Sequence, residues 1–185
     1  FLSIGLLLGS RWAYLELGWG GYWAWDPVEN VALMPWLALT AFVHSSMAQE
    51  SRSLLRKWNI CLIFIAFFLS IFGTFITRSG LISSVHSFAQ SSIGPYFIVF
   101  ILLLVGFSIF IYQRNKRFIC SNQEIVSLFS KENFFIFNNI FFLVITLTVL
   151  LGTIFPILSE AITGEKILVG PSFYNLVNFP NVLLL

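Results

Sequence analysis

The sequence is poor in charged residues. Only 10% of its 185 residues are charged, whereas 58% are hydrophobic, and soluble domains carry about 25% charged residues. The composition therefore excludes a soluble globular fold and favours the bilayer, where each spanning helix needs about 20 mostly apolar residues. The net charge of +2 gives no global field that would indicate a nucleic-acid partner.

Cysteine and histidine are scarce as well. The two cysteines, Cys61 and Cys120, form no C-x-x-C pair and no C-x-x-C-H haem-attachment run, so the chain is not itself a c-type cytochrome. There is no P-loop, no H-E-x-x-H, no G-x-S-x-G and no zinc-type spacing of cysteine and histidine. Cofactor chemistry remains open, because a cofactor carries the difficult step while protein groups position and tune it.

Long apolar runs divide the chain into predicted membrane spans. A truncated span over 1–8 is followed by four spans and by a mixed tail over 156–185 that we expect outside the membrane. Because the sequence starts and ends within apolar runs, we expect residues 1–185 to be a fragment of one multi-pass membrane domain. The predicted fold is all-α, a polytopic transmembrane helix bundle, with full spans over 31–47, 58–77, 95–112 and 134–155.

The basic residues predict the orientation of these spans. Three of them, Arg11, Arg78 and Lys166, lie in loops of one side. The positive-inside rule places the side richer in basic residues in the cytoplasm, so the loop with Trp19, the loop with His86 and the tail are predicted to lie outside. The other seven, on the cytoplasmic side, are Arg52, Arg56, Lys57, Arg114, Lys116, Arg117 and Lys131.

The run W-G-G-Y-W-A-W-D-P-V-E-N, residues 19–30, is the densest pattern in the chain. Its second half predicts a helix start. Asp26 is a favourable N-cap, Pro27 suits the first helical position, and Glu29 stands three residues after the cap, as in a capping box. This structural role alone accounts for Asp26 and Glu29, and a role in ligand binding is the alternative.

The aromatic half of this run also has two interpretations. Trp and Tyr gather at membrane interfaces, so an aromatic belt explains them. The other interpretation is a platform for a flat amphipathic ligand such as haem, favoured by the density of the rings and by Gly20-Gly21, which allows close backbone approach. The four rings belong to Trp19, Tyr22, Trp23 and Trp25.

The chain has two histidines. His44 stands 14 residues after Asn30, roughly 20 Å along a helix, and an ionisable group within a span indicates a functional site. Thr40, one turn earlier, is placed to orient its ring. The alternative for His44 is a neutral histidine packed between helices.

His86 lies in a loop predicted to be on the outer side, shared with the aromatic run. Imidazole is a common axial haem ligand, although an isolated loop histidine is usually only solvated. Arg78, at the outer end of a span and beside a glycine able to cap the helix, is either an interface anchor or a partner for a haem propionate.

These residues resemble the CcmF family of haem-handling membrane proteins. Residues 19–26 are similar to the tryptophan-rich "WWD" motif, which the CcmC and CcsA families share. The segments that single out CcmF cover most of the chain, and Tyr22 is a departure where many members have Trp. They are D-P-V-E-N at 26–30, M-P-W-L at 34–37, H-S at 44–45, G-T-F at 73–75, T-R-S-G at 77–80, S-V-H-S-F-A at 84–89, L-G-T at 151–153 and V-G-P at 169–171.

The resemblance implies a haem lyase, which attaches haem through thioethers to the C-x-x-C-H cysteines of apocytochrome c. It implies that His86, Trp23 and Trp25 are the catalytic residues. His86 is then an axial iron ligand of the substrate haem, and His44 is an axial iron ligand of a resident haem b. The implied cofactor-binding set is His44, His86, Trp19, Tyr22, Trp23, Trp25, Asp26 and Arg78.

The resemblance also implies partners and a location. These are the haem chaperone CcmE, apocytochrome c, subunits of the CcmH and CcmI type, and membrane lipid. The expected location is a bacterial inner membrane rather than a mitochondrial one, with the active face toward the periplasm. Two alternatives stay open. One is a haem transporter or delivery protein of the CcmC or CcsA type, of which the CcmC type needs no intramembrane haem and hence no His44. The other is a scaffold whose Trp residues only anchor it.

Overall fold

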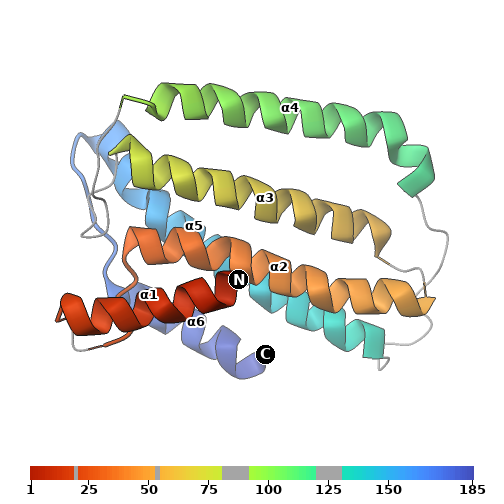
Figure 1. Cartoon of the computed structure of the whole chain (residues 1–185), viewed down its shortest axis with the longest axis horizontal. Coiled ribbons are helices and arrows are strands. Elements are labelled where there is room, and N and C mark those ends of the chain that lie inside the picture. Colours follow the sequence, from red (N-terminus) through yellow and green to blue (C-terminus); the bar gives the residue numbers. More distant parts are fainter. Residues whose placement is uncertain (19–20, 53–54, 81–91, 120–130) are drawn as a thin grey trace.

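The computed structural model describes residues 1–18, 21–52, 55–80, 92–119 and 131–185, and all regular structure in that part of the chain is helical. This confirms the predicted all-α class. The helices are α1 (Leu2–Glu16), α2 (Pro27–Arg52), α3 (Arg56–Ser79), α4 (Gly94–Ile119), α5 (Lys131–Thr163) and α6 (Pro171–Leu184), arranged as in Figure 1.

Helix α2 is the centre of the bundle. It packs against α3 on one side and α5 on another, while α4 lies outside α3 and α6 packs on α5 (Figure 1). Small side chains of α2 permit this close packing, since Ala38 and Ala41 are fully buried. The buried apolar core is shared by four helices and includes Met34, Ala38, Ala41, Leu62, Ala66, Ile145, Val149 and Tyr174.

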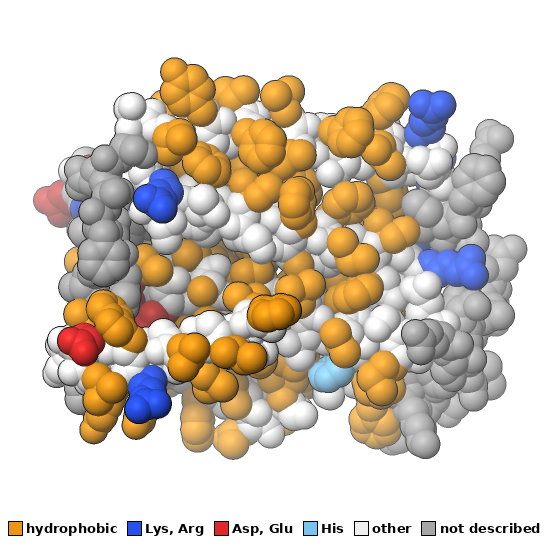
Figure 2. All heavy atoms as spheres, viewed as in Figure 1, with side chains coloured by type: hydrophobic (Ala, Val, Ile, Leu, Met, Phe, Trp, Pro, Cys, Tyr) orange, Lys and Arg blue, Asp and Glu red, His pale blue; other side chains and the backbone are white. Residues whose placement is uncertain are grey.

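Three helical segments are long and apolar enough to cross a membrane: Arg56–Ser79, Gly94–Lys116 and Asn133–Thr163. Helix α2 has 26 residues and is the least apolar of the six described helices. It still exposes Leu39, Val43 and Met47 on one face. Figure 2 shows apolar side chains across the middle of the molecule, with charged groups toward its two ends.

The predicted boundary at Pro156 differs from the structure. Helix α5 continues through this proline to Thr163, and part of the predicted tail forms α6. A proline removes only one backbone donor, and a helix with packed neighbours tolerates that loss. Ser159 stabilises the following connection, since its hydroxyl donates to the Pro156 carbonyl (3.1 Å) and accepts the Ile167 N–H (3.0 Å).

Candidate functional site

The first turn of α2 is a complete capping box. Asp26 Oδ2 accepts the Val28 N–H at 3.0 Å, and Glu29 Oε2 accepts the Asp26 N–H at 3.2 Å. This confirms the predicted helix start at Pro27 and the capping role of both carboxylates. Glu29 Oε2 also accepts the Ala24 N–H at 3.0 Å, so the same carboxylate holds the backbone between Trp23 and Trp25.

Trp25 has a backbone conformation that large side chains rarely adopt. Its φ is +57°, in the left-handed region, which costs about 1–3 kcal/mol for a residue other than glycine. Its carbonyl accepts a hydrogen bond from Asn30 Nδ2 at 3.1 Å. A residue in this conformation persists only where several contacts hold it in place. The side chain of Trp25 makes such contacts.

The indole of Trp25 is held from α6, far along the chain. Its Nε1–H donates to Asn175 Oδ1 at 2.8 Å. Its ring stacks on Tyr174, with centroids 5.0 Å apart and planes 12° apart. One face of the indole is therefore covered, and the half-buried remainder borders the space between α2 and α6.

Tyr174 is itself fixed by α2 and α5. It is 2% exposed, and the side chains of Thr153 and Asn30 lie beside its hydroxyl. Asn30 Nδ2 also donates to Thr153 Oγ1 at 3.2 Å, and Thr153 donates to the Val149 carbonyl at 2.7 Å. A buried polar cluster thus connects the start of α2, the middle of α5 and the start of α6.

Trp23 lies beside Trp25 but faces another way. The two rings are 6.0 Å apart and nearly perpendicular, at 87°, and Trp23 lines a pocket of about 180 Å³ between α1 and α2. Tyr22 stacks on Tyr14 of α1 with ring centroids 4.5 Å apart. Because the two indole planes are perpendicular, a flat macrocycle that stacks on one of them meets only an edge of the other.

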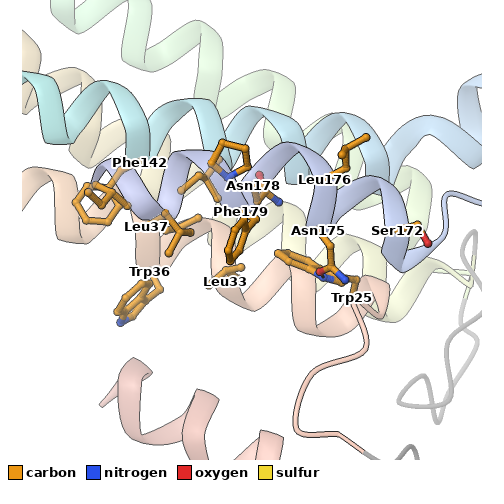
Figure 3. Close-up of a pocket in the computed structure, with 14 residues that line it drawn as sticks. Trp25, Leu33, Trp36, Leu37, Phe142, Ser172, Asn175, Leu176, Asn178 and Phe179 are labelled. Atoms are coloured by element: carbon orange, nitrogen blue, oxygen red, sulfur yellow. The ribbon is translucent and has the colours of Figure 1, made fainter.

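Trp25 lines a groove of about 940 Å³ between α2, α5 and α6. Its walls are mainly apolar and aromatic, and α6 contributes the amides of Asn175 and Asn178 (Figure 3). Asn178 is 3% exposed, and neither polar atom of its side chain has a partner among the described residues. At its far end the groove reaches Phe142 of α5.

His44 lies on α2 beyond that end of the groove. Its ring is near the rings of Phe142 (centroids 5.5 Å apart) and Phe135 (6.0 Å) of α5. Its Nδ1 is buried and has no hydrogen-bond partner in the described part of the chain. Thr40 does not supply one, because its hydroxyl donates to the Trp36 carbonyl at 2.8 Å.

The structure brings some predicted site residues together and leaves others apart. Trp23, Trp25 and Asp26 cluster at the start of α2, whereas His44 is about five turns further along that helix. Arg78 is exposed in the last turn of α3, which ends at Gly80 with φ +68°, the expected glycine cap. Trp19 and His86 lie outside the described residues.

Three residues of the cluster were not predicted from the sequence: Asn30, Tyr174 and Asn175. Asn30 is the last residue of the D-P-V-E-N segment, and its place in that motif is the sequence signal that could have identified it. Tyr174 and Asn175 belong to no motif, and their contacts with Trp25 span about 150 residues, as the Trp25–Asn175 hydrogen bond shows. No local pattern reports such a contact.

Comparisons with known proteins found relatives in cytochrome c biogenesis. Residues 1–86 match the family described as "Cytochrome C assembly protein". The chain is 44% identical over 181 residues to "Cytochrome c-type biogenesis protein CcmF" of Pseudomonas aeruginosa, covering 97% of this chain and 27% of that protein. It is 40% identical over 176 residues to the protein of the same name from Escherichia coli, covering 95% and 27%.

A solved structure titled "Cytochrome c Heme Lyase CcmF" has the same fold. It superposes with a TM-score of 0.74 at 34% identity, covering 99% of this chain and 26% of that chain. The chain spans about a quarter of the length of the relatives it matches.

Proposed function

The chain is related over nearly its whole length to one part of the CcmF cytochrome c biogenesis proteins, and on this basis we propose that it forms the haem-handling part of a cytochrome c haem lyase. The reaction adds the S–H of an apocytochrome cysteine across a haem vinyl group. A C–S bond and a C–H bond form, the S–H bond breaks and the vinyl C=C becomes single, so no atom leaves.

The observation that carries this proposal is the conformation of Trp25. A bulky residue at φ +57° is retained at a cost. Asn30 of α2 holds its carbonyl, and Asn175 and Tyr174 of α6 hold its indole in one pose. An interfacial belt needs no such fixed pose, because lipid headgroups accommodate many ring orientations. A fixed aromatic face suits a rigid flat substrate, which must be presented in one orientation for reaction.

In this proposal Trp25 and Trp23 contact the haem in different ways. Trp25 offers a face and Trp23 an edge, as their perpendicular planes require. Trp19 and Tyr22 widen the aromatic surface, Asp26 holds its supporting turn, and Arg78 pairs with a propionate. His86 ligates the substrate iron and so determines which side of the haem meets the cysteines.

His44 fits a second role, as a ligand of a resident haem b. Its unpartnered Nδ1 and the neighbouring Phe135 and Phe142 rings offer an imidazole in apolar aromatic surroundings. When bound, such a haem supplies one-electron reduction of the substrate iron. The chain's contribution is to hold the imidazole between α2 and α5 and to exclude water around it.

The partners follow from the same relationship. CcmE delivers the haem, subunits of the CcmH and CcmI type present apocytochrome c, and lipid surrounds the bundle. The protein acts in a bacterial inner membrane, with the aromatic loop on the periplasmic side.

The test is the yield of holocytochrome c in cells that express full-length variants, with and without added imidazole. We expect His86→Gly to lose synthesis and to regain part of it with imidazole, because a free ligand fills the vacated position. Trp25→Gly should lose synthesis without that recovery, because imidazole cannot replace a platform. Normal yield from both variants without imidazole would refute the proposed outer site.

A further inference from the structure

The geometry points to Asn175 and Tyr174 of α6 as positioning residues for the haem platform, and we propose that they set the pose of the Trp25 indole. The inference rests on the proposed function for the role of Trp25 itself. It adds that a helix outside the tryptophan-rich loop is a working part of the site.

The contacts of α6 support this inference. Within the described part of the chain its backbone packs only against α5. The groove separates it from α2, and Trp25 lines one end of that groove, next to Asn175 (Figure 3). Trp25 therefore connects two helices whose backbones do not otherwise pack together.

The Trp25–Asn175 contact acts on the orientation of the ring more than on the stability of the fold. The Trp25–Asn175 hydrogen bond is exposed, and a hydrogen bond of this kind contributes little net stability. The left-handed backbone of Trp25 opposes folding by a comparable amount or more. The packing of the indole against the core and Tyr174 offsets this strain, and the directed bond to Asn175 adds a fixed orientation.

The two positioning residues restrict different motions. Asn175 fixes the indole edge through one directed hydrogen bond, which prevents rotation of the ring about its side-chain bonds. Tyr174 covers one face at a near-parallel angle, so only the opposite face remains for a ligand. Together they determine which face of Trp25 a haem meets.

The test uses full-length protein labelled with 5-fluorotryptophan and a ¹⁹F NMR spectrum. The Trp25 resonance is assigned as the one missing in Trp25→Phe, and holocytochrome c yield is measured in parallel. Asn175→Leu removes the acceptor at similar size, and Asn175→Asp keeps it. Asn181→Leu is the matched control, because Asn181 lies on the same helix and donates only to its own Val177 carbonyl at 2.7 Å.

We expect Asn175→Leu to shift the Trp25 resonance and to lower the yield about two- to tenfold, the effect of one hydrogen bond on the population of a pose. Asn175→Asp should keep the Trp25 resonance and the yield near their wild-type values. Asn181→Leu should change neither the resonance nor the yield. If Asn175→Leu protein does not accumulate, Asn175→Ala makes the same deletion with less added bulk.

An unshifted Trp25 resonance in Asn175→Leu overturns the proposal, and so does a shifted resonance with normal yield. Failure of the underlying function is recognised separately. If Trp25→Ala makes holocytochrome c at the normal level, Trp25 has no haem role, whatever the spectrum of the Asn175 variants shows.

Discussion

A substitution at Gly152 of α5 should displace the Trp25 indole indirectly, through Tyr174 of α6. A Cβ at this position would lie 2.6 Å from the Tyr174 hydroxyl and 2.7 Å from two of its ring carbons. Ordinary contact begins at 3.4 Å, so the Tyr174 ring must move by about 0.8 Å or more. Because the Trp25 indole stacks on the Tyr174 ring, the indole must move as well.

The size of the effect follows from two opposing terms. Overpacking a filled site costs about 1–3 kcal/mol, whereas replacing glycine by alanine within a helix gains about 1 kcal/mol. The Gly152→Ala protein should therefore be destabilised by roughly 0–2 kcal/mol in net terms. A cost of about 1–2 kcal/mol on the wild-type pose of Trp25 lowers the population of that pose roughly 5- to 30-fold.

The matched control is Gly106→Ala in α4, where an added Cβ meets nothing within 4 Å. This variant gains the helix propensity of alanine over glycine and suffers no overpacking. It should therefore be as stable as the wild type or more stable. The assay compares thermal unfolding of purified full-length variants with holocytochrome c yield in cells. Equal yield and equal stability for the two alanine variants would show that Tyr174 and Trp25 are not coupled as described.

Three further predictions concern other parts of the chain. Glu29→Ala removes the acceptor of two backbone N–H groups and should lower the unfolding free energy by about 1–2 kcal/mol; Glu29→Gln, which keeps an oxygen, should lose less in the same denaturation assay. His44→Ala should abolish the b-type absorbance of the purified protein while Ser46→Ala keeps it, and unchanged bands in His44→Ala would identify a merely packed histidine. With Cys61 and Cys120 replaced by serine, Ser84→Cys should react with an impermeant maleimide on intact cells and Ser51→Cys should not; equal labelling of both would contradict the predicted orientation.

The sequence predicted the features that depend on local or repetitive signals. Apolar runs indicated a helical bundle, and the order Asp26, Pro27, Glu29 predicted the start of α2, because caps depend on neighbours a few residues away. The perpendicular rings of Trp23 and Trp25 were beyond reach, since a plane angle depends on tertiary packing. The continuation of helix α5 past Phe155 was not predicted, because Pro156 is a strong breaker only in a helix without packed neighbours.

The structure also explains one short motif by its physics. The segment L-G-T at 151–153 contains no charged or aromatic side chain that would indicate a role. Gly152 leaves the space that the Tyr174 ring fills, and the Thr153 side chain lies beside the Tyr174 hydroxyl. Two adjacent residues of α5 thus fix one aromatic ring of α6.

The modest apolarity of α2 bears on how the chain is inserted into the bilayer during synthesis. A segment carrying Asn30, His44, Ser45 and Gln49 partitions poorly from the translocon by itself, because each polar group opposes entry into lipid. Helix α3, by contrast, is apolar enough to enter alone, and it begins at Arg56, only a few residues after α2 ends at Arg52. We therefore expect the two to enter as a hairpin, with α2 remaining dependent on its neighbour until α5 is made. Shortening the apolar run of α3 should then cause α2 to be left in the aqueous phase and degraded, although no residue of α2 has changed.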